Sequence, residues 1–222
     1  MMRAKVNFLS AISPSVIPQP SDWSEYENMT GYWFLDAPED FVPPQDLVEF
    51  IKAGTPPVYI GFGSMSGQQA EEVTKIALAA LVKTKQRGIF LTGWSGVENV
   101  DLPEHIFQIS SIPHSWLFPQ MACIVHHGGA GTTAATFRAG VPGIIIPFLG
   151  DQPFWGYQSV KLGVSPVTIP RDKLTVDALA AAIIRAVEDK VIRQNAMILG
   201  EKIRNENGVK NAVEIINKTL EK

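Results

Sequence analysis

A glycine-rich turn between two short apolar runs constrains the fold of this chain more than any other feature. The stretch from Cys123 to Gln152 reads CIVHHGGAGTTAATFRAGVPGIIIPFLGDQ. An apolar run ends in two histidines, enters the glycines, and continues through small helix-forming residues to a second apolar run. This order predicts a strand, a turn, a helix and a strand. Glycines let backbone N–H groups approach an anion, and the helix N-terminus adds partial positive charge. The stretch therefore predicts a diphosphate site.

Short apolar runs alternate with helical periodicity through most of the chain. Helical spacing of apolar residues predicts helices over 71–84, 178–187, 190–205 and 209–220, the second capped by Thr175 or Asp177. Because the expected strands are separated by helices, we predict an α/β fold. This fold is a Rossmann-like parallel sheet of about six strands with helices on both faces. The expected strands are 58–62, 88–92, 106–109, 123–126, 143–146 and 167–169.

The first 46 residues are rich in proline and aromatic residues and lack the alternation of strand and helix patterns. Prolines at both ends make long helices unfavourable there, and only 29–35 suits a short strand. Since the segment has too little periodic apolar surface for a core of its own, we interpret 1–46 as an interdomain connector or N-terminal extension. Residues 47–222, including the C-terminal helices, then form one binding domain. A chain that begins with a connector is expected to be a fragment.

Composition excludes several other classes of protein. The chain has 222 residues, of which 45% are hydrophobic and 18% charged, with a net charge of -3. A globular domain fits these values, and the basic surface typical of nucleic-acid binding is absent. Cys123 is the only cysteine, so neither an intrachain disulfide nor a CxxC metal site can form. We expect a cytoplasmic protein without a membrane-spanning run, and peripheral membrane contact is compatible with the sequence.

Several distinctive clusters follow expected strands. In an open parallel sheet, ligands bind beyond the carboxyl ends of the strands. The clusters 63–66, 93–96, 112–115 and 127–133, with the pair 151–152, should therefore meet at one edge. Each has an ordinary alternative. Ser64 could merely cap a helix, Trp94 could be a surface plug instead of a stacking platform, and His114 could cap a turn.

The two adjacent histidines and the later Asp-Gln pair differ in what they suggest. His126 ends a buried strand and suits a structural role, whereas an imidazole N–H of His127 could reach a phosphate oxygen. Asp151 and Gln152 could be ordinary loop residues. A carboxylate beside an amide also suits recognition of vicinal hydroxyls, because together they accept and donate hydrogen bonds.

The glycine turn does not match the common nucleotide signatures. HHGGAGT lacks the GxGxxG spacing of dinucleotide sites and the GK[ST] ending of a P-loop. A sugar nucleotide fits better than either alternative.

At these residues the chain resembles the C-terminal, donor-binding half of UDP-dependent glycosyltransferases of family 1, which have the GT-B fold. The resemblance rests on IPHSWLFPQMACIVHHGGAGTTAATFRAGVPGIIIPFLGDQPFWG and on GFGSM upstream. Within that family the chain is most similar to the sterol 3-beta-glucosyltransferases, whose interdomain connector resembles SPSVIPQPSDW and TGYWFLD. GW after the second strand is shared with bacterial glycopeptide-type transferases.

The resemblance implies a role for each matching position. Ser64 would contact a donor phosphate, and the segment with Ile112 and His114 would hold the uracil. Asp151 and Gln152 would recognise the sugar hydroxyls. Trp94 is placed like a tryptophan of the glycopeptide group. The expected donor-binding residues are Ser64, Trp94, Ile112, His114, His127, Ala130, Gly131, Thr132, Asp151 and Gln152.

His127 would touch the diphosphate, with the turn after it supplying N–H and hydroxyl donors. Plant members of the family place a glutamate on the donor ribose where this chain has Ala135, so that contact is absent or made elsewhere.

The mechanism implied by the resemblance is an inverting hexosyl transfer from a UDP-sugar co-substrate, glucose above all, without a metal or other cofactor. The acceptor would be a lipophilic hydroxyl compound such as a sterol. The family's general base is a histidine of the N-terminal acceptor domain, and no histidine of this chain matches its motif. We therefore expect UDP or UDP-glucose binding without transfer by the chain alone.

Other interpretations stay open at this point. The chain could be a subunit of a two-chain glycosyltransferase, a sugar-nucleotide 2-epimerase of the same fold, or a non-catalytic nucleotide-binding module. The last helix could pack on its own sheet. It could instead expose its apolar face, which in the resembling enzymes crosses onto the first domain and here would favour self-association.

Overall fold

Five parallel strands form the central sheet in the computed structural model, which describes residues 6–63, 68–91 and 102–221 and, for 68–70, the backbone alone. The order β5-β4-β3-β6-β7 means that the chain moves outward from β3 in one direction and then returns to its other side. This reversal between β3 and β6 is the position at which open α/β sheets form their ligand crevice. The strands are β3 (Val58–Gly61), β4 (Gly88–Leu91), β5 (Ile106–Ile109), β6 (Cys123–His126) and β7 (Gly143–Ile145).

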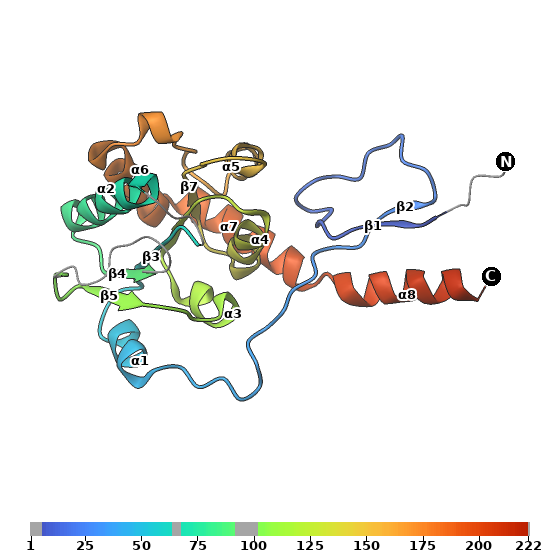
Figure 1. Ribbon diagram of the computed structural model, residues 1–222, viewed down its shortest axis with the longest axis horizontal. Helices are drawn as coiled ribbons and strands as arrows, with labels where there is room; N and C mark the ends of the chain where they lie inside the picture. Colours follow the sequence, from blue (N-terminus) through green and yellow to red (C-terminus); the bar gives the residue numbers. More distant parts are fainter. Residues whose placement is uncertain (1–5, 64–67, 92–101, 222) are drawn as a thin grey trace.

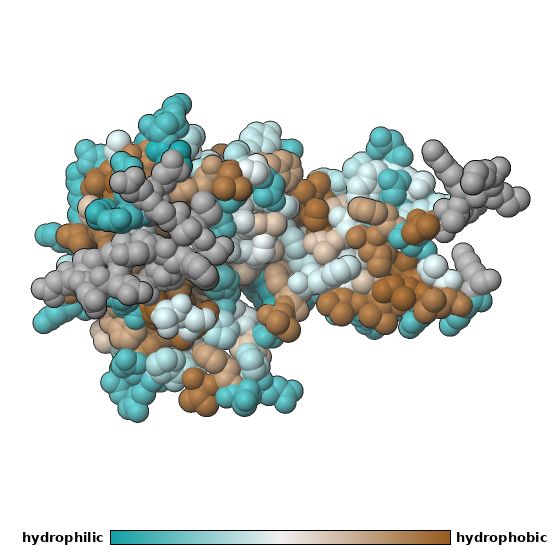
Figure 2. Space-filling view, in the orientation of Figure 1, coloured by the Kyte–Doolittle hydropathy of each residue, from teal (hydrophilic) through white to brown (hydrophobic). Residues whose placement is uncertain are grey.

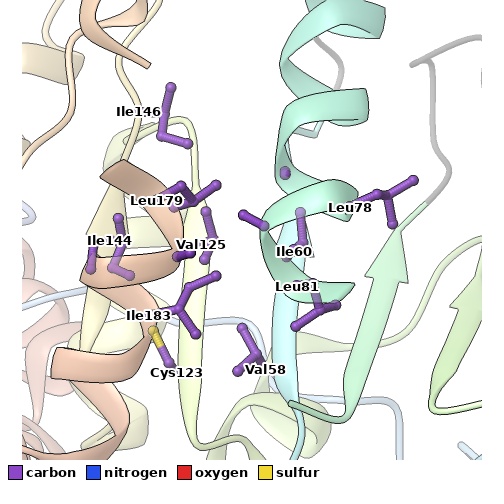
Figure 3. Close-up of a cluster of buried hydrophobic side chains, with 14 of the residues drawn as sticks. Val58, Ile60, Leu78, Leu81, Cys123, Val125, Ile144, Ile146, Leu179 and Ile183 are labelled. Atoms are coloured by element: carbon purple, nitrogen blue, oxygen red, sulfur yellow. The ribbon is translucent and has the colours of Figure 1, made fainter. Parts of the chain in front are cut away.

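Helices cover both faces of this sheet (Figure 1). Alternate strand residues face opposite layers, so Ile60 packs beneath α2 and α6 while its neighbour Tyr59 packs beneath α1 and α3. Figure 3 shows Leu179 and Ile183 of α6 beside Val125 of β6. The helices are α1 (Gln45–Lys52), α2 (Gln68–Thr84), α3 (His114–Leu117), η1 (Phe118–Gln120), α4 (Ala130–Ala139), α5 (Gln152–Lys161), η2 (Arg171–Lys173), α6 (Val176–Glu188), α7 (Lys190–Arg204) and α8 (Gly208–Leu220). The predicted α/β class and parallel sheet are confirmed.

Local chemistry explains several helix ends. The Thr175 hydroxyl accepts a hydrogen bond from the Ala178 N–H at 3.1 Å, which makes Thr175 the N-cap of α6 instead of Asp177. Asp189 caps α7 by accepting from the Val191 N–H at 2.9 Å. Helix α4 ends at Gly140, whose φ of 72° lies in the left-handed region that side chains disfavour. These ends place α4 and α6 against β6 and β7.

The expected sixth strand is reduced to a single bridge. Thr168 pairs with Ile145, and the Ile169 N–H donates to the Ile145 carbonyl at 3.0 Å. The η2 turn begins directly after Pro170, so this segment leaves the sheet before a ladder can form. Among the described residues the sheet therefore has five strands.

The N-terminal segment also differs from the expectation of a strand over 29–35. Its two short strands are β1 (Phe8–Ser10) and β2 (Glu27–Met29), which pair in parallel. Gly31 follows with a φ of 92°, which turns the chain out of extended geometry. The next residues pack on the domain instead, and Tyr32 joins a core cluster with residues of α4 and α7.

Helix α8 and the β1–β2 pair project together from the rest of the molecule (Figure 1). The α7–α8 junction fastens the N-terminal segment, because a Glu206 carboxylate oxygen accepts from the hydroxyls of Ser13 and Ser15 at 2.6 and 3.0 Å. Of the two alternatives considered for α8, the structure agrees with an exposed apolar face and not with packing on the sheet. Its apolar side chains are exposed and form part of a hydrophobic surface in Figure 2. No helix in the described part of the chain is both long and apolar enough to cross a membrane.

Candidate functional site

The predicted binding residues that the structure describes gather at the carboxyl edge of the sheet. The His127 ring lies against the end of β3, where a methyl group added to Gly63 would meet its Cε1 at 3.2 Å. On the other side of the turn, a methyl group on Gly128 would meet the Gln152 carbonyl oxygen at 3.2 Å. The turns after β3, β6 and β7 are therefore in contact, as the sequence predicted. Ser64 and Trp94 lie outside the described residues, so their roles stay predictions.

His126 fixes the shape of the glycine turn from inside the fold. Its ring is fully buried, and its Nδ1 accepts a hydrogen bond from the Gly128 N–H at 3.1 Å. Burial, reinforced by the neighbouring His127 and His114, lowers the pKa of His126 to about 3. The imidazole is therefore neutral at pH 7 and can act as this acceptor. The structural role expected for His126 agrees with this geometry.

Gly128 is the position in the turn that requires glycine. Its φ is 90°, and a Cβ atom there would approach the Ile145 Cγ2 to 2.6 Å. The close fit brings the turn against β7 and directs the following amides toward the edge of the sheet. No larger residue could hold this path without a shift of β7 or of the turn.

The N-terminus of α4 leaves its first amides available for a ligand. The helix starts at Ala130 after Gly129, which caps without a side-chain hydrogen bond. The first N–H groups of a helix have no intrahelical acceptor, and they carry the positive end of its dipole. Space beside Gly131 is open, because an added Cβ would meet no atom within 4 Å. Ala130, Gly131 and Thr132 thus present free backbone N–H groups in an arrangement that could receive an anion.

His127 stands directly before this helix end. Burial lowers its pKa, and the nearby Asp151 carboxylate partly opposes that shift. Its Nδ1 is buried and has no hydrogen-bond partner among the described residues. A neutral imidazole has one donor and one acceptor nitrogen, so a bound phosphate could use the donor.

Asp151 and Gln152 are oriented by neighbouring groups. The Gln152 Oε1 accepts from the N–H groups of Phe148 and Leu149 at 2.6 and 3.1 Å, and its side chain is buried. One Asp151 oxygen accepts from the Trp155 indole at 2.7 Å. The Gln152 amide N–H₂ and the second Asp151 oxygen lack protein partners within the described ranges. An amide donor group and a carboxylate acceptor oxygen are thus left for a polyhydroxylated ligand.

His114 and Ile112 lie at the same edge of the sheet, in the segment that follows β5. The His114 ring stacks on Phe118 with centroids 4.1 Å apart, and burial lowers its pKa. His114 begins α3, and Ile112 packs against the core cluster beneath it. A cavity of about 860 Å³ opens beside His114 and extends along the exposed side of α4. This volume suits a ligand of nucleotide size.

The sequence of the chain matches a known protein family. The chain matches the family model of the erythromycin biosynthesis protein CIII-like C-terminal domain over residues 88–221. The chain belongs to this family. The match includes the glycine turn, the Asp-Gln pair and α4 through α8.

Relatives of the CIII-like domain include sterol transferases. The chain is 43% identical over 209 residues to the sterol 3-beta-glucosyltransferase UGT80A2 of Arabidopsis thaliana, covering 94% of this chain and 33% of that protein. It is 42% identical to the sterol 3-beta-glucosyltransferase of Cryptococcus neoformans var. neoformans serotype D over 100% of this chain and 15% of that protein. The chain therefore spans a third or less of the length of these relatives. The resemblance to glycosyltransferases is confirmed.

Solved structures show the same fold at lower identity. The spinosyn forosaminyltransferase SpnP superposes with a TM-score of 0.80 at 20% identity, covering 96% of this chain and 55% of that one. The glycotransferase of kitacinnamycin gives a TM-score of 0.77 at 21% identity, covering 96% and 54%. The CIII-like domain described here thus has the fold of the C-terminal half of a GT-B glycosyltransferase.

The N-terminal segment supplies part of the site that sequence reasoning missed. Besides His114 and α4, which contributes Arg138, the cavity is lined by residues 32–36. These residues carry no local motif, and the contact between Asp36 and Arg138 joins positions 102 residues apart. The sequence offered no periodic or motif signal for this pairing. The segment interpreted as a connector therefore also forms a wall of the CIII-like domain's cavity.

Proposed function

We propose that this chain is the donor-binding domain of an inverting, UDP-glucose-dependent glycosyltransferase that acts on a lipophilic hydroxyl acceptor such as a sterol. The observation that carries the proposal is the open N-terminus of α4 beside His127, with Asp151 and Gln152 at the same edge. The sugar and acceptor classes come from relatives named sterol 3-beta-glucosyltransferases. A sterol acceptor would bring the whole enzyme to a membrane surface.

The donor would bind with its diphosphate on the first amides of α4. Helix-end N–H groups and a His127 N–H offer hydrogen bonds to phosphate oxygens, and the helix dipole favours their charge. When the bond to the sugar breaks, additional negative charge develops on the departing UDP. The same groups then stabilise the leaving group without a metal ion.

Asp151 and Gln152 would hold the hexose. The free Asp151 oxygen can accept from a sugar hydroxyl, while the Gln152 amide, fixed by its bonds to the 148–149 turn, can donate to another. The buried anchoring of Gln152 keeps this donor in one orientation. Several hexoses would satisfy the pair, and glucose is the sugar that the relatives' names indicate.

None of the chain's histidines is placed to act as the general base. His126 is buried, His114 is stacked on Phe118, and His127 lies beside Gly63 and Gly129, where the diphosphate would bind. His105 immediately precedes β5, at the opposite edge of the sheet. The base would therefore come from outside this chain, and the chain alone would bind the donor without transferring sugar.

Calorimetric titration of the 222-residue chain with UDP and UDP-glucose tests the proposal. We expect saturable binding that EDTA leaves unchanged. His127→Ala should weaken UDP binding at least about ten-fold, because a hydrogen bond to a charged group is lost. The matched control His105→Ala changes a histidine at the opposite edge and should leave the affinity unchanged.

A sterol glucosylation assay completes the test. We expect no glucose transfer by the isolated chain, and transfer once the N-terminal half of a sterol glucosyltransferase is supplied. Absence of saturable UDP binding would overturn the proposed function. Rapid turnover by the chain alone would contradict only the assignment of the base to another segment.

A further inference from the structure

Residues 32–37, which we call the strap, are fastened across the side of α4. The guanidinium of Arg138 donates to both carboxylate oxygens of Asp36, with the second contact, from Nη2 to Oδ2, at 3.2 Å. The same guanidinium lies over the Phe34 ring at 4.5 Å from its centroid. At the end of the strap, the Ala37 N–H donates to the Ser115 hydroxyl at 3.0 Å. Charge pairing, a cation–π contact and a backbone hydrogen bond thus fix its path.

The strap and the helix end share one cavity. The space of about 860 Å³ is bounded by the strap on one side, by the face of α4 that begins at Ala130, and by His114. A nucleoside diphosphate bound at the N-terminus of α4 would extend its nucleoside along this face. Here α4 presents Ala134 and Ala135, which offer no polar side-chain atom to a sugar. Arg138, further along this face, carries only donors and is engaged by Asp36, so an acceptor for the ribose hydroxyls would come from another wall.

Asp36 is the carboxylate among the described residues that line this cavity. A carboxylate has about four acceptor positions, and the fork of Arg138 occupies two of them. The side chain of Asp36 is 62% exposed, so its remaining acceptor positions are open to a ligand or to solvent. The hydrogen bonds from Arg138 lower the pKa of Asp36, which keeps it ionised and accepting at neutral pH.

We propose that Asp36 binds the ribose of the nucleotide by accepting hydrogen bonds from its vicinal 2′- and 3′-hydroxyls, and that Arg138 is the positioning residue that holds Asp36 toward the cavity. The inference rests on the proposed function, since it requires a nucleoside diphosphate at α4. It assigns a ligand contact to the segment that the sequence identifies as a connector. Arg138 acts through Asp36, because its guanidinium is engaged by the carboxylate and by Phe34.

The test compares UDP with 2′,3′-dideoxyuridine diphosphate, which lacks both hydroxyls. Dissociation constants for the 222-residue chain are measured by calorimetry for the wild type, Asp36→Asn and Asp40→Asn. We expect the wild type to prefer UDP by about ten-fold or more, because hydrogen bonds to an ionised carboxylate are lost with the analogue. Asp36→Asn should weaken UDP binding by about this factor and leave the analogue nearly unchanged, so that the preference disappears.

Asp40→Asn is the matched control, since Asp40 is an exposed aspartate four residues further along that does not line the cavity. It should keep the wild-type preference. If Asp36→Asn weakens both ligands equally, or neither, the ribose contact is wrong while UDP binding and the proposed function stand. Loss of the preference in Asp40→Asn would also overturn the contact. A wild-type chain that binds neither ligand would overturn the proposed function and this inference with it.

Discussion

His126 is the residue whose protonation state should couple the site to the stability of the fold. Folding buries a neutral imidazole, and its pKa falls from an ordinary value of 6.5 to about 3. The unfolded chain therefore binds the proton more tightly than the folded chain does. Its contribution to stability is fully present above pH 6.5 and is lost progressively as the pH falls from 6.5 toward 3.

Because the unfolded chain binds this proton more tightly, the free energy of unfolding should fall as the pH is lowered. Below pH 6.5, His126 should remove up to about 1.4 kcal/mol of unfolding free energy per pH unit, since one proton is taken up on unfolding. His126→Gln keeps an oxygen that can accept from the Gly128 N–H but does not titrate. Urea unfolding between pH 7 and 5 should show a shallower decline for this variant. Parallel pH profiles for the two proteins would contradict the prediction.

At the scale of elements, the turn between β6 and α4 depends on one glycine. Gly128→Ala would place a Cβ 2.6 Å from the Ile145 Cγ2 at a φ of 90°, so both the contact and the backbone are strained. We expect a loss of about 2–4 kcal/mol in unfolding free energy from these two effects together. Gly131→Ala is the control within the same turn and helix, because its Cβ would meet no atom within 4 Å. Its stability in urea unfolding should stay close to wild type, and equal losses in the two variants would rule out this explanation.

The strands were easier to predict from the sequence than some of the helices. The five strands and the glycine turn were predictable, because apolar runs and turn glycines are local signals. Helices α1 and α5 were not predicted. Helix α1 follows Pro44 with a single buried residue, Leu47, and α5 begins at Gln152, within a segment interpreted as a binding loop.

Contacts between distant segments had no such signal. Asp36 and Arg138 are 102 residues apart, and nothing in either neighbourhood marks them as partners. The predicted strand over 29–35 failed for the same reason. Tyr32 and Phe34 pack against α4 and α7, which is a tertiary contact, and Gly31 turns the backbone away from a ladder. The predicted roles of Ser64 and Trp94 lie outside the described residues.

At the scale of the whole molecule, α8 presents an apolar seam beyond the body of the domain (Figures 1 and 2). Its exposed apolar residues are spaced 4, 3 and 4 positions apart, which is the spacing of a two-heptad coiled-coil seam. Only Gly208 and Ala212 of this helix are buried. The exposed residues of the seam are Val209, Val213, Ile216 and Leu220.

This seam predicts weak self-association of the 222-residue chain through α8, because pairing two seams removes apolar area from water. Sedimentation velocity at tens to hundreds of micromolar, roughly the range in which so small an interface would act, should show a rising sedimentation coefficient. The double variant Ile216→Lys and Leu220→Lys should stay monomeric over the same range, since it places charges in the seam. The control Val191→Lys changes an exposed valine on α7 and should associate like the wild type. A wild-type chain that stays monomeric throughout would show that two short seams bury too little surface to pair. UDP binding should be the same in all three proteins, because none of the substituted residues lines the cavity.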